Sequence, residues 1–313
     1  MKTLLLLTAA LLAAPALATD QPAKPVPSPG EIVAEAPASE WVAIAFDDLL
    51  VMDLATDRNG KARRVVIQLL RPPFSQPWIA NIRTLAKAHW WDGLAIVRAQ
   101  DNYVVQWGDP DAEDAAKAKA LPAGLRATTE AGYVYRPTGG RRHGFRMKPT
   151  PILEDAYAER ATFDAGFPVA REGRDRWPVH CYGSVGVGRD LSPSAGTGAE
   201  LYTVIGHAPR HLDRNIAVVG RVIEGIEHLS TLSRGAEALG FYKMPEERTP
   251  ITSIRLGTEV AGLAAYQYLS TDGEAFARYA DARANRRDPF FIVPAGGADV
   301  CNIPVPVRRA PSG

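Results

Sequence analysis

Three side chains with complementary chemistry lie close together in the stretch RAQDNYVVQWGD, residues 98–109: Arg98, Tyr103 and Gln106. Arginine carries a charge that it keeps at any working pH, tyrosine offers an aromatic wall, and glutamine offers both a donor and an acceptor. Each residue alone has an ordinary explanation, as an ion-pair partner, a core aromatic or a polar barrel residue. The stretch therefore has a structural and a chemical interpretation, and the rest of the chain must decide between them.

Other catalytic and metal-binding patterns have little support in the chain. His180 and Cys181 are neighbours, and neighbours on a strand point to opposite faces, so they do not form a nucleophile–base pair. His207 and His211 have the spacing of a helical metal site, but a proline between them indicates a loop. The glycine-rich GSVGVG, residues 183–188, lacks the Lys-Ser/Thr of a phosphate loop and favours close strand packing instead. We expect no metal and no cofactor.

The N-terminal segment, residues 1–18, is typical of a secretory signal peptide: a lysine, a short apolar run and an Ala-Leu-Ala cleavage site. The apolar run is short for a membrane span, so stable membrane insertion is not expected, and an uncleaved anchor is the weaker alternative. We expect export through the general secretory route to the periplasm. The net charge of +1 gives no reason to expect nucleic-acid binding.

The two cysteines, Cys181 and Cys301, could form a disulfide in an oxidising compartment. Only one pairing is possible, but the sequence does not show whether the two α-carbons lie close enough. The sequence also leaves the oligomeric state open.

The organisation of the rest of the chain is readable in part. Residues 19–40 are rich in proline, alanine and small polar residues, which predicts a flexible spacer. An amphipathic helix is predicted at 76–89, with Ser75 as its N-cap, and a second helix at 225–237. Strand-like segments are predicted at 41–54, 63–70, 94–99, 103–109, 182–188, 200–206, 215–225 and 249–260.

Two regions outside these elements are harder to interpret. Residues 110–176 predict an elaborated insertion, with short helices at DAEDAAKAKA and EDAYAERATF. Residues 261–313 predict a C-terminal helical extension and tail, broken near Gly273. The body of the chain, 41–260, has more strands than helices and no βαβ alternation. This pattern favours a mainly β fold, a closed or nearly closed antiparallel barrel with helices over its ends.

The segment IVRAQDNYVVQWGD, residues 96–109, resembles without a gap the motif FHRVxxxFxxQGGD of the cyclophilin-type peptidyl-prolyl cis-trans isomerases. The resemblance implies a closed eight-stranded antiparallel β-barrel capped by two helices. It implies that Arg98 is the catalytic arginine, that Tyr103 is part of the proline pocket, and that Gln106 binds the substrate backbone. No cofactor is implied.

The resemblance continues in later segments and covers most of 41–109 and 180–258. GSVGVGRD is similar to the family's GTLSMANA-type strand, ELYTVIG to its SQFFI strand, and HLDRNIAVVGRVIEGIE to its WLDGKHVVFGKVxEGM segment. These matches imply further substrate-binding positions at Val187, Gly188, Arg189, Leu201, Tyr202, His211 and Leu212. Arg189 stands where the family has asparagine, and His211 where it has an aromatic residue.

The resemblance implies a peptidylprolyl isomerase, and the signal-like N-terminal segment implies that it acts on proline-containing segments of exported proteins. The physical chemistry agrees, because a fixed guanidinium can donate to the prolyl nitrogen when the peptide bond twists, and neither nucleophile nor metal is needed. A second hypothesis is a chaperone or peptide-binding module without useful catalysis. Arg189, His211 and the long insertion are the features that favour this alternative.

Overall fold

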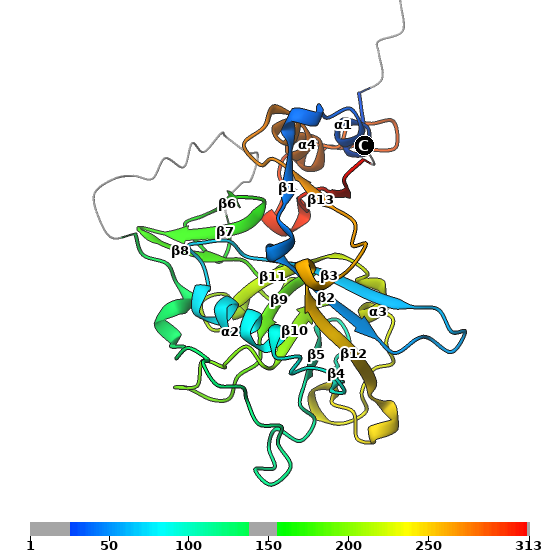
Figure 1. Ribbon diagram of the computed structural model, residues 1–313. Helices are drawn as coiled ribbons and strands as arrows, with labels where there is room; N and C mark the ends of the chain where they lie inside the picture. Colours follow the sequence, from blue (N-terminus) through cyan, green and yellow to red (C-terminus); the bar gives the residue numbers. More distant parts are fainter. Residues whose placement is uncertain (1–25, 138–154, 312–313) are drawn as a thin grey trace, which may run out of the picture.

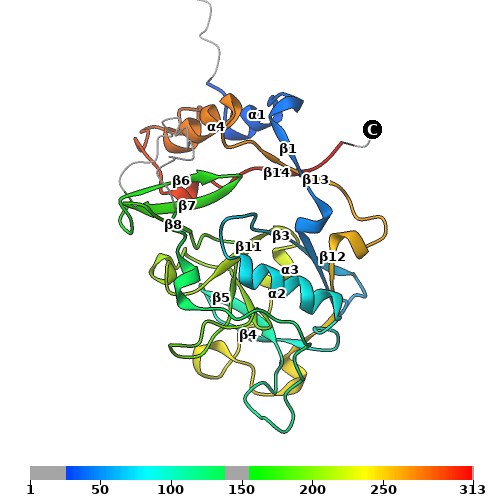
Figure 2. The ribbon, with the colours of Figure 1, turned by 60° about the vertical axis from the view of Figure 1, so that its left-hand side comes forward.

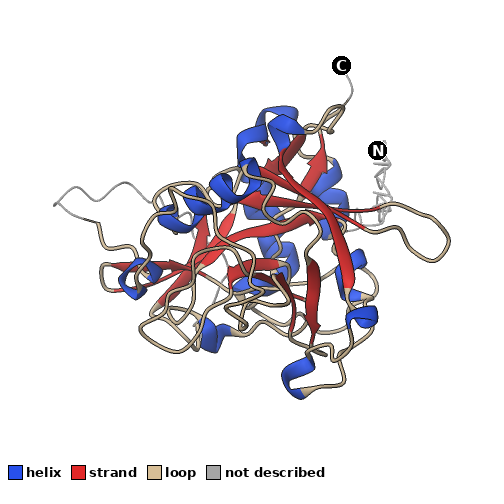
Figure 3. Ribbon diagram, turned by 60° about the horizontal axis from the view of Figure 1, so that its bottom comes forward, coloured by secondary structure: helices blue, strands red, loops and turns tan. Residues whose placement is uncertain are grey.

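The chain forms a closed barrel of eight antiparallel strands, in the order β10-β5-β4-β12-β2-β3-β11-β9 (Figure 1). The structure is a computed structural model and describes residues 26–137 and 155–311. The barrel strands are β2 (Leu49–Leu54), β3 (Arg63–Leu69), β4 (Ala95–Ala99), β5 (Val104–Gly108), β9 (Ser184–Val187), β10 (Leu201–Val204), β11 (Val218–Glu224) and β12 (Thr249–Leu256). The predicted fold class is confirmed: strands make up the body, and helices lie around it (Figure 3).

Alternation along the strands fills the barrel interior. On β3, Val65 and Ile67 belong to the barrel core, whereas Val66 between them packs outside it. This two-residue period is the pattern that predicted the strand. The turn between β2 and β3 also forms where TDRNGKA predicted it, with Asp57 accepting hydrogen bonds from the backbone of Asn59 and Lys61.

Two helices pack on the barrel core. Helix α2 (Gln76–Lys87) buries Trp78, Ile82 and Leu85, the face predicted from the helical spacing. Ser75 occupies the N-cap position, but its hydroxyl donates to the carbonyl of Val218 instead of accepting a hydrogen bond from the helix. Helix α3 (Glu227–Ser230) is a single turn, so the helix predicted at 225–237 is too long.

The insertion contains a three-stranded sheet that the sequence did not predict. Its strands are β6 (Arg160–Asp164), β7 (Phe167–Glu172) and β8 (Asp175–Pro178). Ala165 and Gly166 both have positive φ and form the two-residue turn between β6 and β7. The two helices expected in this region are therefore corrected: DAEDAAKAKA forms turns, and EDAYAERATF leads into β6. Residues 138–154 of the insertion lie outside the described residues.

The N- and C-terminal segments fold together into a third sheet. Strand β1 (Trp41–Ile44) pairs with β13 (Tyr266–Leu269), which pairs with β14 (Val307–Arg309). Beside this sheet, α1 (Pro29–Ala34) contacts α4 (Glu274–Ala284). Both small sheets and both of these helices lie on the same side of the barrel (Figures 1 and 2).

These observations correct two further expectations. Residues 19–25 of the predicted flexible spacer, 19–40, lie outside the described residues, and the remainder is helical at α1, where Ser28 and Glu31 form a capping box. The predicted helical extension, 261–313, contributes two strands as well as α4. Contacts with distant segments override the local composition in both cases: α1 contacts α4, and β13 pairs with β1 and β14. The predicted signal peptide, 1–18, lies outside the described residues.

A disulfide joins the C-terminal segment to the loop between β8 and β9. Cys181 and Cys301 have an S–S distance of 2.03 Å and a Cα–Cα distance of 5.1 Å. Cys301 lies in a short 3-10 helix, Val300–Asn302. Within the described residues, every helix is too short or too polar to cross a bilayer.

Candidate active site

A pocket of about 570 Å³ opens on the outer face of the barrel, beside β4, β5 and β10. It is lined by Val97, Arg98, Tyr103, Val104, Gln106, Asp109, Pro110, Ala112, Glu113, Gly188, Arg189, Asp190, Glu200, Tyr202, Leu212, Ile216, Leu239, Phe241, Tyr242 and Arg248. The three residues of the opening stretch thus share one pocket, together with residues from several loops. The volume falls within the range usual for small-molecule and peptide side-chain sites.

A bulge in β4 aims Arg98 at this pocket. The register of β4 against β5 shifts between Ile96 and Arg98, so that Val97 and Arg98 both line the outer pocket, while Ile96 and Ala99 belong to the barrel core. Bulges re-aim side chains in this way. After the bulge, Arg98 pairs directly with Gln106 on β5.

The guanidinium of Arg98 is held by uncharged acceptors. Nε donates to the carbonyl of Leu239 at 2.6 Å, Nη1 donates to Oε1 of Gln106 at 3.0 Å, and Nη2 donates to Oε1 of Gln100. Among the described residues no carboxylate forms an ion pair with it, which argues against a purely ion-pairing role. Three of the five N–H groups of arginine are used, and two remain for a ligand.

Aromatic rings flank the same guanidinium. Its Cζ lies 5.6 Å from the ring centre of Tyr103 and 5.3 Å from that of Phe241. Burial lowers the pKa of Arg98, whereas the nearby Tyr103 and Glu200 raise it; the intrinsic pKa of a guanidinium is high enough that Arg98 stays protonated at neutral pH. The site therefore presents a cation against aromatic surface, where its attraction to a developing lone pair is little screened.

The wall of the pocket next to Arg98 is apolar. Tyr202, Val104 and Val204 form a small cluster outside the barrel, and Tyr103, Leu212 and Ile216 pack against it. All but Val204 line the pocket. These surroundings suit a ligand with a small hydrophobic ring, which the apolar wall would hold beside the hydrogen-bond donor Arg98.

Comparison with known proteins agrees with this geometry. The family model described as "Cyclophilin type peptidyl-prolyl cis-trans isomerase/CLD" matches residues 52–256. The chain belongs to the cyclophilin-type peptidyl-prolyl cis-trans isomerase family. The comparison with curated proteins gives no match.

Among solved structures, the chain is similar to the cyclophilin AquaCyp293 from Hirschia baltica, with 20% identity and a TM-score of 0.61 over 90% of this chain and 98% of that chain. The part of this chain that is covered, 90%, is larger than the range 52–256 that the family model matches. The shared fold therefore includes residues outside that range. A cyclophilin type peptidyl-prolyl cis-trans isomerase from Cryptosporidium parvum is 11% identical, covers 66% of this chain and 98% of its own, and has a TM-score of 0.37.

The other predicted positions divide between the pocket and the barrel interior. Gly188, Arg189, Tyr202 and Leu212 line the cyclophilin pocket with the first three residues. His211 is exposed and stacks beside Tyr103, with ring centres 6.3 Å apart. The assignment of Val187 and Leu201 to substrate binding is corrected: both are fully buried in the barrel core. Leu201 precedes the pocket residue Tyr202 on β10, and consecutive residues on a strand point to opposite faces; Val187 is the last residue of β9 and directly precedes the pocket residue Gly188.

Glu200 is a pocket residue that the sequence reasoning missed. Its Oε1 accepts a hydrogen bond of 2.6 Å from Nε2 of Gln106, and its side chain packs against Gly188. Burial raises the pKa of Glu200, although the bond from Gln106 lowers it. The available signal was its position: Glu200 directly precedes Leu201 and Tyr202 in the segment already matched to the family.

The loop between α3 and β12 supplies the remaining missed contacts. The backbone N–H of Tyr242 donates to the carbonyl of Val97 at 3.0 Å, and Phe241 forms an isolated antiparallel β-bridge with Arg98. The loop therefore runs beside β4. Leu239 has a positive φ and turns its carbonyl to Arg98. Residues 233–248 contain no sequence motif from which their contact with Arg98 could be predicted.

Proposed function

We propose that this cyclophilin catalyses cis-trans isomerisation of X-Pro peptide bonds, with Arg98 as the catalytic residue. The barrier of about 18–20 kcal/mol exists because the nitrogen lone pair is delocalised into the carbonyl. In the twisted state the lone pair returns to nitrogen, and a hydrogen bond to it stabilises that state more than either ground state. The two isomers differ by only about 0.5–1 kcal/mol, so no energy source or cofactor is required.

The observation that carries the proposal is the state of the Arg98 guanidinium. It is charged, it lies in a pocket with aromatic neighbours, and its hydrogen-bond partners among the described residues are neutral. An arginine kept for stability alone is expected to face a carboxylate. Here the charge is left available, and two N–H groups have no acceptor within the part of the chain that the structure describes.

The other pocket residues are assigned supporting roles. The cluster of Tyr103, Tyr202 and Leu212 would hold the proline ring while the preceding carbonyl turns. Gln106 already orients Arg98 and retains one amide hydrogen for the substrate backbone. Arg189 would lie at the pocket rim, where its guanidinium donates to the carbonyls of Asp190 and Asn215.

We further propose that the substrates are proline-containing segments of exported proteins and that the protein works in the periplasm. Two observations support this location. The first is the signal-like N-terminal sequence. The second is the disulfide between Cys181 and Cys301, because disulfides persist in oxidising compartments and are rare in the cytosol.

The test is a protease-coupled isomerisation assay on a short X-Pro peptide. Arg98→Ala should lower kcat/KM by about two to three orders of magnitude, the usual loss when a transition-state donor is removed. Arg64→Ala is the matched control, since Arg64 lies on the barrel surface and pairs with Asp53. Full activity in a folded Arg98→Ala protein would reject the assignment.

The same assay separates the second hypothesis. If the wild type binds proline peptides but does not accelerate isomerisation, the protein is a peptide-binding module or chaperone. The contact that would favour this result is the bond from Arg98 Nε to Leu239, because it draws the guanidinium toward the loop.

A further inference from the structure

A buried histidine contacts one of the pocket residues without lining the pocket itself. His180 lies in the loop between β8 and β9 and is fully buried. Its Nε2 lies 2.8 Å from the hydroxyl of Tyr202, and the two rings are nearly parallel, at 6°. Tyr202 lines the pocket, and the hydroxyl at the end of its side chain is held by His180.

A glycine on β9 makes this contact possible. Gly186 pairs with Tyr202 across the β9–β10 ladder, and the phenol lies over its backbone. A Cβ at position 186 would lie 2.3 Å from both Cζ and the hydroxyl oxygen of Tyr202. A larger residue at position 186 would therefore displace the phenol. The orientation of the phenol thus depends both on Gly186 in β9 and on His180 in the loop before β9.

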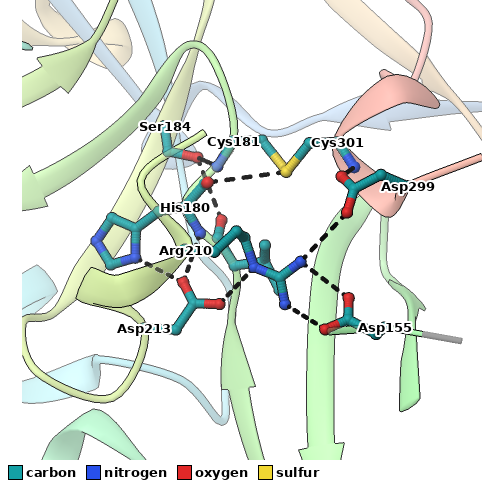
Figure 4. The surroundings of a disulfide bond; sticks show 9 residues. Asp155, His180, Cys181, Ser184, Arg210, Asp213, Asp299 and Cys301 are labelled. Carbon is teal, nitrogen blue, oxygen red and sulfur yellow. Dashed lines mark hydrogen bonds and ion pairs between the residues drawn. A yellow bond between two sulfur atoms is a disulfide. The ribbon is translucent and has the colours of Figure 1, made fainter. Parts of the chain in front are cut away.

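The histidine is itself held by a buried ionic cluster (Figure 4). Asp213 accepts hydrogen bonds from Nδ1 of His180 at 2.9 Å and from its backbone N–H at 3.0 Å. Arg210 donates to the other oxygen of Asp213 at 2.7 Å and forms two bonds to Asp155. It also lies 3.6 Å from Asp299, which caps the 3-10 helix that carries Cys301.

The charges in this cluster determine the direction of the hydrogen bonds. Burial raises the pKa of the Asp213 carboxyl, but the bond from His180 and the charge of Arg210 outweigh it, so the pKa is lowered. An ionised Asp213 accepts, so Nδ1 of His180 must donate. Burial holds the pKa of the Tyr202 hydroxyl well above its usual value, so this hydroxyl keeps its proton and can donate it to Nε2 of a neutral imidazole.

The cluster also fixes a second part of the pocket. Arg210 and Asp213 lie at the two ends of a short 3-10 helix, Arg210–Leu212, with Leu212 between them. Leu212 is one of the apolar residues that pack beside Tyr202. The ionic cluster thus holds the backbone that presents one pocket side chain and the histidine that orients another.

We propose that His180 is a positioning residue of the pocket: by accepting the Tyr202 hydroxyl, it fixes the ring that contacts the proline. The inference rests on the proposed function, because it assigns the ring to proline binding. It extends that function to a residue with no access to the substrate. A ring that grips proline equally in the planar and twisted states affects binding more than the chemical step.

The experiment compares Tyr202→Phe, His180→Phe and the double variant. Each single variant should raise KM for an X-Pro peptide by about three- to tenfold, the range expected for one hydrogen bond, with kcat changed less than about twofold. The double variant should be no worse than the more affected single variant, because both remove the same contact. Tyr182→Phe, on an exposed tyrosine, is the matched control and should leave KM unchanged.

Two additions keep the test decisive. His180→Gln offers a donor for Asp213 and an acceptor for Tyr202, so it should recover most of the lost affinity. Wild-type KM in folded Tyr202→Phe would overturn the proposal, as would losses that add in the double variant. Direct titration of an X-Pro peptide separates the two claims: a wild type that binds but does not catalyse rejects the proposed function, and the affinity of Tyr202→Phe then decides the positioning role.

Discussion

The outer surface of the barrel is used in two different ways. Beside β4, β5 and β10 it remains open and forms the pocket. Beside β2, β3 and β11 it is covered, because Leu49, Val66 and Ile223 pack against the second hydrophobic core, which the insertion and the terminal segments build. The inside of the barrel is apolar in both places, so what distinguishes a site from a scaffold is whether another layer covers the outside.

The covered face is assembled from distant parts of the chain, whereas the central residues of the open face come from one hairpin. The second core contains residues from before β2, from the insertion and from after β12. The central residues of the pocket lie within nine positions of each other on β4, β5 and their turn. Changes to the covered face should therefore alter stability, and changes to the open face should alter activity.

The largest expected effect on stability comes from the disulfide. Replacing Cys181 and Cys301 with serine should lower the free energy of unfolding by about 4–5 kcal/mol, because the bond closes a loop of more than a hundred residues in the unfolded chain. Denaturant unfolding measures the loss. Reductant should reproduce it in the wild type and have no effect on the double serine variant. An unchanged midpoint in the variant would show that the covering layer is held by packing alone.

The next effect separates the two faces directly. Phe276 is fully buried on α4 and packs edge-on against Phe163 of β6, with ring centres 5.0 Å apart. Phe276→Ala should cost about 3–5 kcal/mol of stability. Once folded, the variant should keep its kcat/KM, since the residue does not line the pocket.

Phe241→Ala is the matched variant on the open face. Phe241 is half-buried beside Arg98, so its removal should lower kcat/KM while costing less stability than Phe276→Ala. If Phe276→Ala instead lowered kcat/KM as much as Phe241→Ala, the separation between scaffold and site would be wrong. Chemical unfolding and the isomerisation assay, run on both variants, give the four values needed.

The smallest effect is a pH dependence at Glu200. Burial raises its pKa above the ordinary value of 4.5, so the unfolded chain ionises first as the pH rises. The folded state therefore loses stability as the pH rises from about 4.5 through the folded pKa. Glu200→Gln keeps the shape and an acceptor for Gln106 but cannot ionise.

The free energy of unfolding of Glu200→Gln should therefore equal that of the wild type at acidic pH. As the pH rises, it should become larger than that of the wild type, which alone loses stability when Glu200 ionises. Unfolding free energies measured across this range check the sign. A variant that is less stable than the wild type at neutral pH would mean that the charged form of Glu200 is favoured, and that Arg98 compensates its burial.

Much of the barrel was predictable because its signals are local. The β-branched alternation around Val65 and Ile67, the apolar helix face of Trp78 and Ile82, and the hairpin motif of residues 96–109 need only neighbouring residues to be recognised. The insertion was harder, since Ala165 and Gly166 form a tight turn between strands of mixed composition. Strand pairing within it decided the structure against the helical appearance of the sequence.

By itself, the sequence determined the family, the barrel and the hairpin that presents Arg98, Tyr103 and Gln106, because a strand register sets which residues share a face. Only the tertiary structure decided which groups hold them. Leu239 lies 141 residues from Arg98 and Glu200 lies 94 residues from Gln106, and His180 reaches Tyr202 only after β9 and β10 have paired. Such contacts depend on how distant segments pack together in space, and the spacing of residues along the chain does not predict that packing.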